Sequence, residues 1–194
     1  SEVKNLLNNP IIYFYKYDGN SSNYTIDDSN KYKKYLKTDS KKSNSFSLAE
    51  FSTYIDYKSN LLVIKSSVVN NSYLINQNII DFKWKISNEK KKIGNYLCTK
   101  ASTIYKDEKI VAYFTDEIPF SAGPSIYLGL PGLIVYLEAQ DRTYTATKIE
   151  TFDKIIVEKL TGGKVVSEKE YSDFVEKYKN KEIIEEKIEE YHEN

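Results

Sequence analysis

Short stretches along most of the chain alternate apolar and polar positions, the pattern of half-buried β-strands. Phe82, Trp84 and Ile86 give the clearest case, because each is followed by a polar residue, and they predict one buried strand face. The strands predicted in this way are Ile11–Tyr17, Phe51–Tyr57, Leu61–Ser67, Tyr73–Ile75, Phe82–Ile86, Ile93–Tyr105, Lys109–Thr115, Gly132–Gln140, Arg142–Glu150, Phe152–Leu160 and Lys164–Ser167.

Short polar or glycine-containing segments separate these strands and predict tight turns. They are Asp18-Gly19, Lys58–Asn60, Lys106–Glu108, Asp141 and Thr161–Gly163. Consecutive strands joined by such turns favour antiparallel pairing. We therefore expect an α+β, mainly β fold, with a single curved antiparallel sheet or an open half-barrel and a C-terminal helix.

The two ends of the chain have a different pattern. Asn20–Ser47 is rich in Ser, Asn and Lys and predicts a long loop, with one helical turn near Lys31–Lys37. Ser1–Asn9 is compatible with a short helix or a ragged end. Ser167 and Glu170 have the spacing of a capping box and predict the start of an acidic helix that covers a sheet edge or face.

Apolar residues then follow helical spacing in two stripes that are out of step across Asn180, which predicts a kink or two helices. The first stripe is Tyr171, Phe174, Val175 and Tyr178, and the second is Ile184, Ile188 and Tyr191. We expect one domain over residues 1–194, in which a loosely structured part (1–50) precedes a β core (51–167) and a helical tail (168–194).

Charge is balanced overall, with 28 basic and 28 acidic residues, but the first half of the chain is basic and the second half acidic. Both signs are scattered, and no nucleic-acid-binding motif is present, so no nucleic-acid partner is predicted. No apolar stretch is long enough to span a membrane. The sequence contains no Met, and we therefore expect a trimmed chain, as after removal of a signal peptide.

Few residues suggest catalytic chemistry. Zinc catalysis and Ser-His-Asp hydrolysis need His residues on a rigid frame, and the one His is His192, near the end of the chain. Cys98 is the only Cys and is interpreted as a small core residue rather than a nucleophile. Gly162-Gly163-Lys164 is interpreted as a turn, because it lacks the spacing of a phosphate-binding loop. We predict no catalytic residue, no metal site and no cofactor.

Two alternatives nevertheless remain open. Carboxylates at Asp116, Glu117, Glu138 and Asp141 could serve a hydrolase. Aromatic and apolar side chains could fill a core, or could line a site for an apolar ligand or a partner protein. The candidate binding residues are Trp84, Tyr113, Phe120, Tyr127, Leu130 and Leu133.

The segment Gly129–Ile134 combines a Leu-Pro-Gly turn with the start of a strand. Pro131 and Gly132 suit the two central positions of a type II turn from Leu130 to Leu133, with positive φ at Gly132. Gly129 is expected to allow a close backbone approach. Ile118-Pro119 and Gly123-Pro124 would stiffen the loop before it, so this loop is either a structural turn or a docking epitope.

An ordered series of motifs between residues 80 and 150 closely resembles the GLPGLI family. The series consists of Trp84–Ile86, Lys92–Ala101, Ala112–Pro119, Gly123-Pro124 and Gly129–Ile134. Relatives often have Trp in the strand before the Ile-Pro pair, where this chain has Tyr113 or Phe114.

The resemblance implies an exported protein of Bacteroidetes-type bacteria, located in the periplasm or cell envelope and encoded near outer-membrane receptors. The strand pattern also resembles the half-barrel of periplasmic lipoprotein carriers, an analogy of fold only.

These observations favour a non-enzymatic envelope protein that binds an apolar ligand or a partner protein and is accessory to outer-membrane transport. A hydrolase and a purely structural protein associated with a receptor are the alternatives. An outer-membrane receptor is the partner that the resemblance suggests. The ligand, the oligomeric state and the presence of a lipid anchor do not follow from the sequence.

Overall fold

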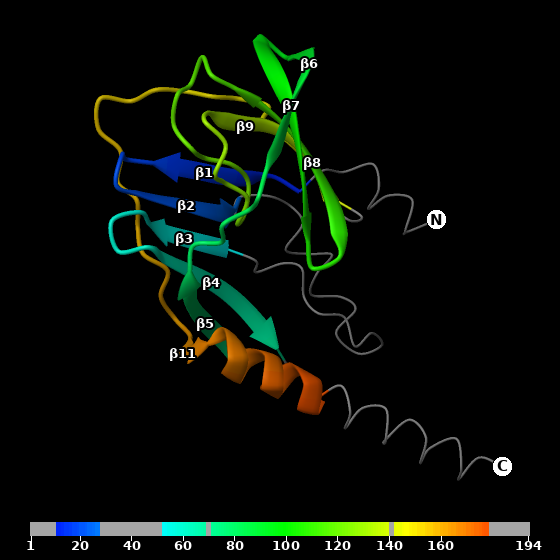
Figure 1. The fold of residues 1–194 in the computed structure, drawn as a ribbon. Coiled ribbons are helices and arrows are strands. Elements are labelled where there is room, and N and C mark those ends of the chain that lie inside the picture. Colours follow the sequence, from blue (N-terminus) through cyan, green and yellow to red (C-terminus); the bar gives the residue numbers. More distant parts are fainter. Residues whose placement is uncertain (1–10, 28–51, 69–70, 140–141, 179–194) are drawn as a thin grey trace, which may run out of the picture. The chain divides into compact units, whose positions relative to one another are not determined.

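The computed structural model describes residues 11–27, 52–68, 71–139 and 142–178. The chain divides into two compact units, shown together in Figure 1. The first contains Ser1–Phe14, Asn20–Asn78 and Glu158–Asn194, and the second contains Tyr15–Gly19 and Ile79–Val157. The helix 179–194, the helical turn at 31–37 and the element at 1–9 that the sequence suggests lie outside the described residues.

A six-stranded sheet has the order β1-β2-β3-β4-β5-β11. Its strands are β1 (Tyr13–Tyr17), β2 (Ser21–Ile26), β3 (Ser52–Asp56), β4 (Leu61–Val68), β5 (Asn71–Asn78) and β11 (Lys164–Ser167). The predicted hairpin of β3 and β4 is confirmed, with Tyr54 opposite Val63. Its turn forms because Asp56 Oδ1 accepts hydrogen bonds from the backbone N–H groups of Lys58 and Ser59.

Strand β2 corrects the prediction of one continuous loop from Asn20 to Ser47. Ser21, Ser22 and Asn23 are buried despite their polarity, and side-chain atoms of Ser22 and Asn23 have hydrogen-bond partners in the same unit. Ser22 Oγ and Tyr57 OH are hydrogen-bonded at 3.1 Å, and Asn23 Nδ2 donates to Glu158 O at 3.1 Å. A polar sequence can therefore form a buried strand where hydrogen bonds offset the cost of desolvation.

The prediction of a strand at Phe152–Leu160, paired with Lys164–Ser167, is wrong. Residues 146–163 contain no regular element, whereas β11 pairs in parallel with β5, so that Val166 lies opposite Ile75. Gly163 suits this pairing, because a Cβ there would make a tight contact of 3.1 Å with Ser72 O. A parallel neighbour so distant in the sequence leaves no turn signal.

One helix, residues 168–178, follows β11 (Figure 1). The predicted capping box is confirmed: Ser167 Oγ accepts from Glu170 N at 3.2 Å, and the Glu170 carboxylate accepts from Ser167 N at 2.7 Å. The helix covers part of the sheet, as expected. Its apolar stripe packs on Tyr73, Ile75 and Val166, and consists of Tyr171, Phe174 and Val175.

A five-stranded antiparallel sheet of the second unit has the order β10-β9-β8-β7-β6. Its strands are β6 (Lys85–Ile93), β7 (Tyr96–Tyr105), β8 (Glu108–Thr115), β9 (Leu133–Ala139) and β10 (Arg142–Thr145). The predicted hairpin of β7 and β8 is confirmed. Lys106 and Asp107 form its turn, with φ of 50° and 65°, as in a type I′ turn.

Strand β6 differs from its prediction in two ways. Phe82 and Trp84 precede the strand, and Ile86 is 53% exposed rather than buried. In addition, Ile93 and Tyr96 flank a tight turn at Gly94, where φ is 57°, so Ile93–Tyr105 is not one strand. The Gly94-Asn95 pair, a dipeptide that favours a tight turn between two strands, accounts for the break.

The mainly β fold with a C-terminal helix is thus confirmed, with the described strands in two open sheets instead of one. The chain forms two compact units, and the single domain expected over 1–194 stays a prediction. No helix among the described residues has the length and hydrophobicity that crossing a membrane requires.

Candidate functional site

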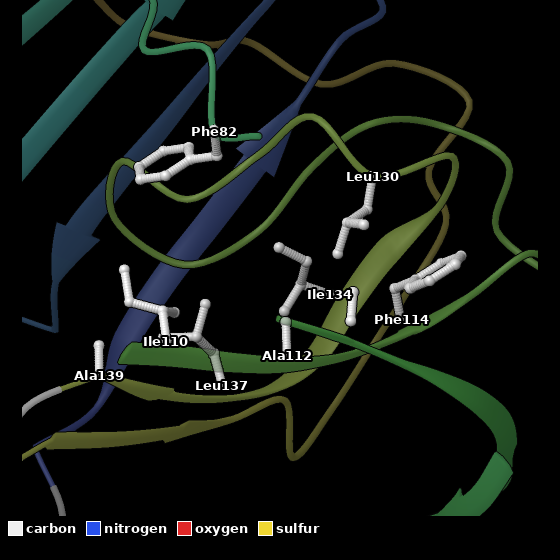
Figure 2. Packing of buried hydrophobic residues seen from close by; sticks show 9 residues of the cluster. Phe82, Ile110, Ala112, Phe114, Leu130, Ile134, Leu137 and Ala139 are labelled. Carbon is white, nitrogen blue, oxygen red and sulfur yellow. The ribbon is translucent and has the colours of Figure 1, made fainter. Parts of the chain in front are cut away.

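The loop that leads into β9 and contains Gly129–Gly132 covers one face of the five-stranded sheet. Alternate residues of β8 and β9 point toward this loop, and Figure 2 shows Leu130 and Phe82 lying across them. The buried cluster that results consists of Phe82, Ala101, Ile110, Ala112, Phe114, Leu130, Ile134, Leu137 and Ala139. This face is a packed core.

Backbone hydrogen bonds hold the loop in place. Leu133 N donates to Ile118 O at 3.1 Å, and Ile134 N donates to Ala122 O at 2.8 Å. Trp84 Nε1 donates to Leu128 O at 2.8 Å, so the only Trp of the chain binds the backbone of the loop. The Trp84 side chain therefore has a structural role in holding this loop.

The two glycines of the motif have roles opposite to those predicted. Gly129 has φ of +100°, whereas Gly132 is not among the residues with positive φ. A Cβ at Gly132 would lie 2.0 Å from Thr115 O, so this position needs Gly because the two backbones touch. The type II turn with Gly132 at its third position is therefore wrong.

A second close approach lies at Gly123. A Cβ there would be 2.3 Å from Tyr127 O. The following residues form a turn in which Tyr127 N donates to Pro124 O at 3.1 Å, and Ser125 has φ of 58°. The Gly-Pro pair and the Gly-Leu-Pro-Gly segment thus both allow the backbone of one loop to pack closely.

Most of the predicted binding residues belong to this core. Leu130 and Leu133 are 1% and 8% exposed, and Trp84 and Tyr127 pack against the buried cluster. Burial also raises the pKa of Tyr127 to about 12. Phe120 stacks on Tyr17 with ring centroids 4.6 Å apart. In the motif itself, Gly129 and Pro131 are exposed and the apolar side chains are buried.

Tyr113, the sixth predicted residue, lies on the opposite face of the same sheet. Register places Lys100, Tyr113 and Tyr136 directly opposite one another on β7, β8 and β9. Charged residues surround this row, and we call the group the tyrosine face. It consists of Glu89, Lys91, Lys100, Tyr113, Tyr136 and Glu138.

A bulge in β6 places Glu89 over this row. Pairing with β7 shifts between Ile86 and Lys90, so that Ser87, Asn88 and Glu89 stand opposite Lys100 alone. The Glu89 carboxylate accepts from Lys100 Nζ at 2.7 Å and from Tyr113 OH at 2.7 Å. The bulge thus supplies an acceptor that regular pairing would not aim there.

Lys91 lies against both tyrosines. Its Nζ is 5.6 Å from the Tyr113 ring centroid and 5.9 Å from that of Tyr136, within the range of cation–π attraction. The two rings meet edge to face with centroids 6.0 Å apart. The carboxylate of Glu138 accepts a hydrogen bond from Tyr136 OH.

These contacts shift the acid–base equilibria of the tyrosine face. Hydrogen bonds from Lys100 and Tyr113 lower the pKa of Glu89, and the Glu89 carboxylate raises the pKa of Lys100 and of Tyr113. The bond to Glu138 raises the pKa of Tyr136. Each shift favours the charge states that hold the network together, and such clusters concentrate at functional sites.

Tyr113 is itself only 8% exposed and packs with Cys98 and Val135 in a small buried cluster. Cys98 is 0% exposed, and burial raises the pKa of its thiol. A protonated and buried thiol is a poor nucleophile, which agrees with its interpretation as a core residue.

Two of the carboxylates considered for hydrolysis have partners that the structure identifies. Glu117 Oε1 accepts from Leu97 N at 3.1 Å, and Glu138 belongs to the tyrosine face. Asp141 lies outside the described residues. Among those residues, no group of three His, Cys, Asp or Glu side chains is arranged to hold a metal ion.

Tyr113 was among the binding residues predicted from the sequence, whereas Glu89, Lys91 and Lys100 were not. A signal was present, because Lys100 and Tyr113 occupy strands joined by a tight turn whose register fixes their pairing. Glu89 could not be placed, since a bulge in an exposed strand has no distinct sequence pattern here.

Comparison with known proteins finds similarity to a family and to solved structures, and no match among the curated proteins. Residues 102–136 match a family described as "Protein of unknown function (Porph_ging)". This match includes the Gly-Leu-Pro-Gly-Leu-Ile segment and both tyrosines of the tyrosine face.

Structures of PNGF-II in the P21 and C2 space groups are similar in fold. Their identities to this chain are 20% and 17%, with TM-scores of 0.56 and 0.52. The aligned region covers 86% and 85% of this chain but only 30% and 29% of PNGF-II. At these identities the similarity concerns the fold alone, and this chain spans less than a third of PNGF-II.

Proposed function

We propose that this chain is a non-enzymatic binding protein that holds a partner protein on the tyrosine face. The observation that carries the proposal is the row of Lys100, Tyr113 and Tyr136 across three strands, with Glu89 aimed at it by a bulge. Such a fixed array of aromatic and charged side chains on a sheet is suited to recognition, since tyrosine combines apolar area with a hydroxyl.

A partner protein fits this surface better than an apolar ligand does. The charged groups lie at the surface, with the side chains of Lys100 and Glu89 34% and 51% exposed. The apolar side chains Leu130, Leu133 and Ile134, by contrast, are used inside the protein. Paired charges at a surface favour orientation and specificity of protein association.

The hydrolase alternative gains no comparable support. A general acid needs a carboxyl group whose pKa is raised toward neutrality. Glu89, the carboxyl group that accepts hydrogen bonds from Lys100 and Tyr113 at the tyrosine face, is instead held below its ordinary pKa by those bonds, foremost the one from Lys100.

We also propose membership of the GLPGLI family and a location in the cell envelope. The hexapeptide at Gly129–Ile134 and the ordered motifs around it support the membership. An outer-membrane receptor is then the class of partner to examine first, and an accessory role in transport is the corresponding function.

Site-specific photo-crosslinking in the native host tests the binding function. A photoreactive phenylalanine analogue at Tyr136 should capture one partner, and the same analogue at Phe152, exposed at 61%, is the control position. Charge reversal by Lys91→Glu should reduce capture at 136, whereas Lys109→Glu, also exposed but outside the tyrosine face, should not. Equal capture at 136 with and without Lys91→Glu would contradict the proposal.

A further inference from the structure

Among the described strands, β6 forms one edge of the five-stranded sheet, and it is rich in lysine. The strand reads KISNEKKKI, and Lys85–Lys92 are exposed throughout. It ends the five-stranded sheet, where it pairs with β7 on one side. Four of its nine residues are Lys and one is Glu, and that Glu is already bonded to Lys100 and Tyr113.

The bulge limits the part of this edge that can accept another strand. Regular pairing resumes at Lys90, and Lys90–Ile93 run opposite Tyr96–Thr99. A partner strand can therefore align along these four residues, where the backbone is extended and regular. Side-chain alternation puts Lys90 and Lys92 on one face and Lys91 on the tyrosine face.

We propose that the partner contributes an extended acidic segment that pairs along Lys90–Ile93 of β6, an inference that rests on the proposed function. Main-chain hydrogen bonds would provide the pairing, as in other cases of strand addition. Carboxylates on one side of the segment would meet Lys90 and Lys92. A carboxylate on the other side would approach the ammonium group of Lys91, which lies over the rings of Tyr113 and Tyr136.

The lysines of β6 determine which kind of strand can pair with this edge. Lysines on an edge strand prevent pairing with a second copy of the same strand, because like charges would be brought together. The same lysines favour an acidic strand, so repulsion and attraction select the partner together. An extended peptide fits better than a nucleic acid, because a strand edge presents backbone donors and acceptors at peptide spacing.

A defined peptide tests this inference on the full chain. The probe is a fluorescently labelled peptide of alternating Glu and Thr, titrated at low and at high salt. Saturable binding is expected, weakened by salt and about tenfold weaker for Lys90→Glu/Lys92→Glu. Lys154→Glu/Lys169→Glu is the control, with the same change of charge at exposed positions elsewhere, and should bind as the unaltered protein does.

Two comparison ligands separate strand addition from charge attraction. The Glu-Thr peptide with an N-methyl group at every residue keeps its charge but loses its backbone donors on both edges, and it should not bind. An oligothymidylate of similar charge should also bind poorly. Absence of saturable binding, equal binding of the N-methylated peptide, or equal affinity for the oligonucleotide would each overturn the inference.

The peptide-binding experiment and the crosslinking experiment can fail separately. If position 136 captures a partner whose capture survives Lys90→Glu/Lys92→Glu, the tyrosine face binds a partner and strand addition is wrong. If neither the peptide nor a partner is captured, both proposals fail.

Discussion

Gly129 and Gly132 illustrate how a short motif can combine two separate steric requirements. Gly129 supplies a backbone conformation with φ of +100° that residues with a Cβ rarely adopt. Gly132 leaves room for Thr115 O, which a Cβ would approach to 2.0 Å. The intervening Pro131 is exposed and has no comparable steric requirement.

Alanine substitutions should rank these requirements. Gly132→Ala should lower the free energy of unfolding by about 1–3 kcal/mol, because backbone atoms must move apart. Gly129→Ala should cost about 1 kcal/mol through strain at positive φ, since its Cβ would meet Trp84 only at an ordinary 3.6 Å. Urea denaturation measures both, with Pro131→Ala as the control. A larger loss for Gly129→Ala would contradict this order.

Glu89 gives a residue-level prediction for pH. Its pKa is lowered from the ordinary 4.5 in the folded protein, so folding favours its charged form. The stabilisation is therefore complete above the unfolded pKa and disappears as pH falls through the folded pKa. The melting temperature of the unaltered protein should exceed that of Glu89→Gln near about pH 7, and the difference should shrink toward about pH 3. A difference that stays constant with pH would contradict the assigned network.

At the scale of elements, the turn between β7 and β8 is not optimal in sequence. Lys106 and Asp107 both have positive φ, which Asn-Gly satisfies with less strain. Asp107→Gly should therefore stabilise the protein by about 0.5–1 kcal/mol, and Asp107→Val should destabilise it. Thermal unfolding of both variants measures the effect. Equal melting temperatures would indicate that the turn is formed differently.

The helix 168–178 depends on its first turn. Ser167→Ala removes the acceptor for Glu170 N and should cost about 1 kcal/mol, with loss of helical circular dichroism. Lys169→Ala, an exposed change in the same turn, should have little effect. If both variants lose the same stability, capping is not the cause.

The elements differ in how well the sequence predicts them. The hairpins at Lys58–Asn60 and Lys106–Glu108 were predictable because a local turn fixes the register of the strands that it joins. The pairing of β11 with β5 was not, since parallel strands without a local connection leave no turn signal.

The candidate site follows the same rule. Alternation along β8 identifies Tyr113 as a face residue, and the hairpin register brings Lys100 to it. Glu89 depends on a bulge, and the core role of Leu130 depends on how its loop folds back over the sheet. Neither arrangement is visible in a local pattern of hydrophobicity.

For the whole molecule, the two compact units can be followed by different probes. Trp84 is the only Trp and belongs to the second unit, whereas the helix 168–178 belongs to the first. Their cores are separate sets of residues. We expect Trp fluorescence and helical circular dichroism to report different midpoints in denaturant. Phe114→Ala, in the second unit, should shift the fluorescence midpoint more than the helical one.

Coincident midpoints that move together in Phe114→Ala would instead indicate one cooperative unit. That outcome would agree with the single domain that the sequence suggests. Lack of any shift in either signal would contradict the burial of Phe114 in the core.

The parallel pairing of β11 with β5 has a consequence for the order of folding. During synthesis from the N-terminus, β5 emerges long before β11, because Ile75 precedes its pairing partner Val166 by a long stretch of sequence. All strands of the five-stranded sheet are made in that interval. Contacts so distant in the sequence are slow to form, so the nascent chain passes through a stage in which β5 is an uncovered edge. Association of unfinished chains at that edge is the misfolding route that this topology creates.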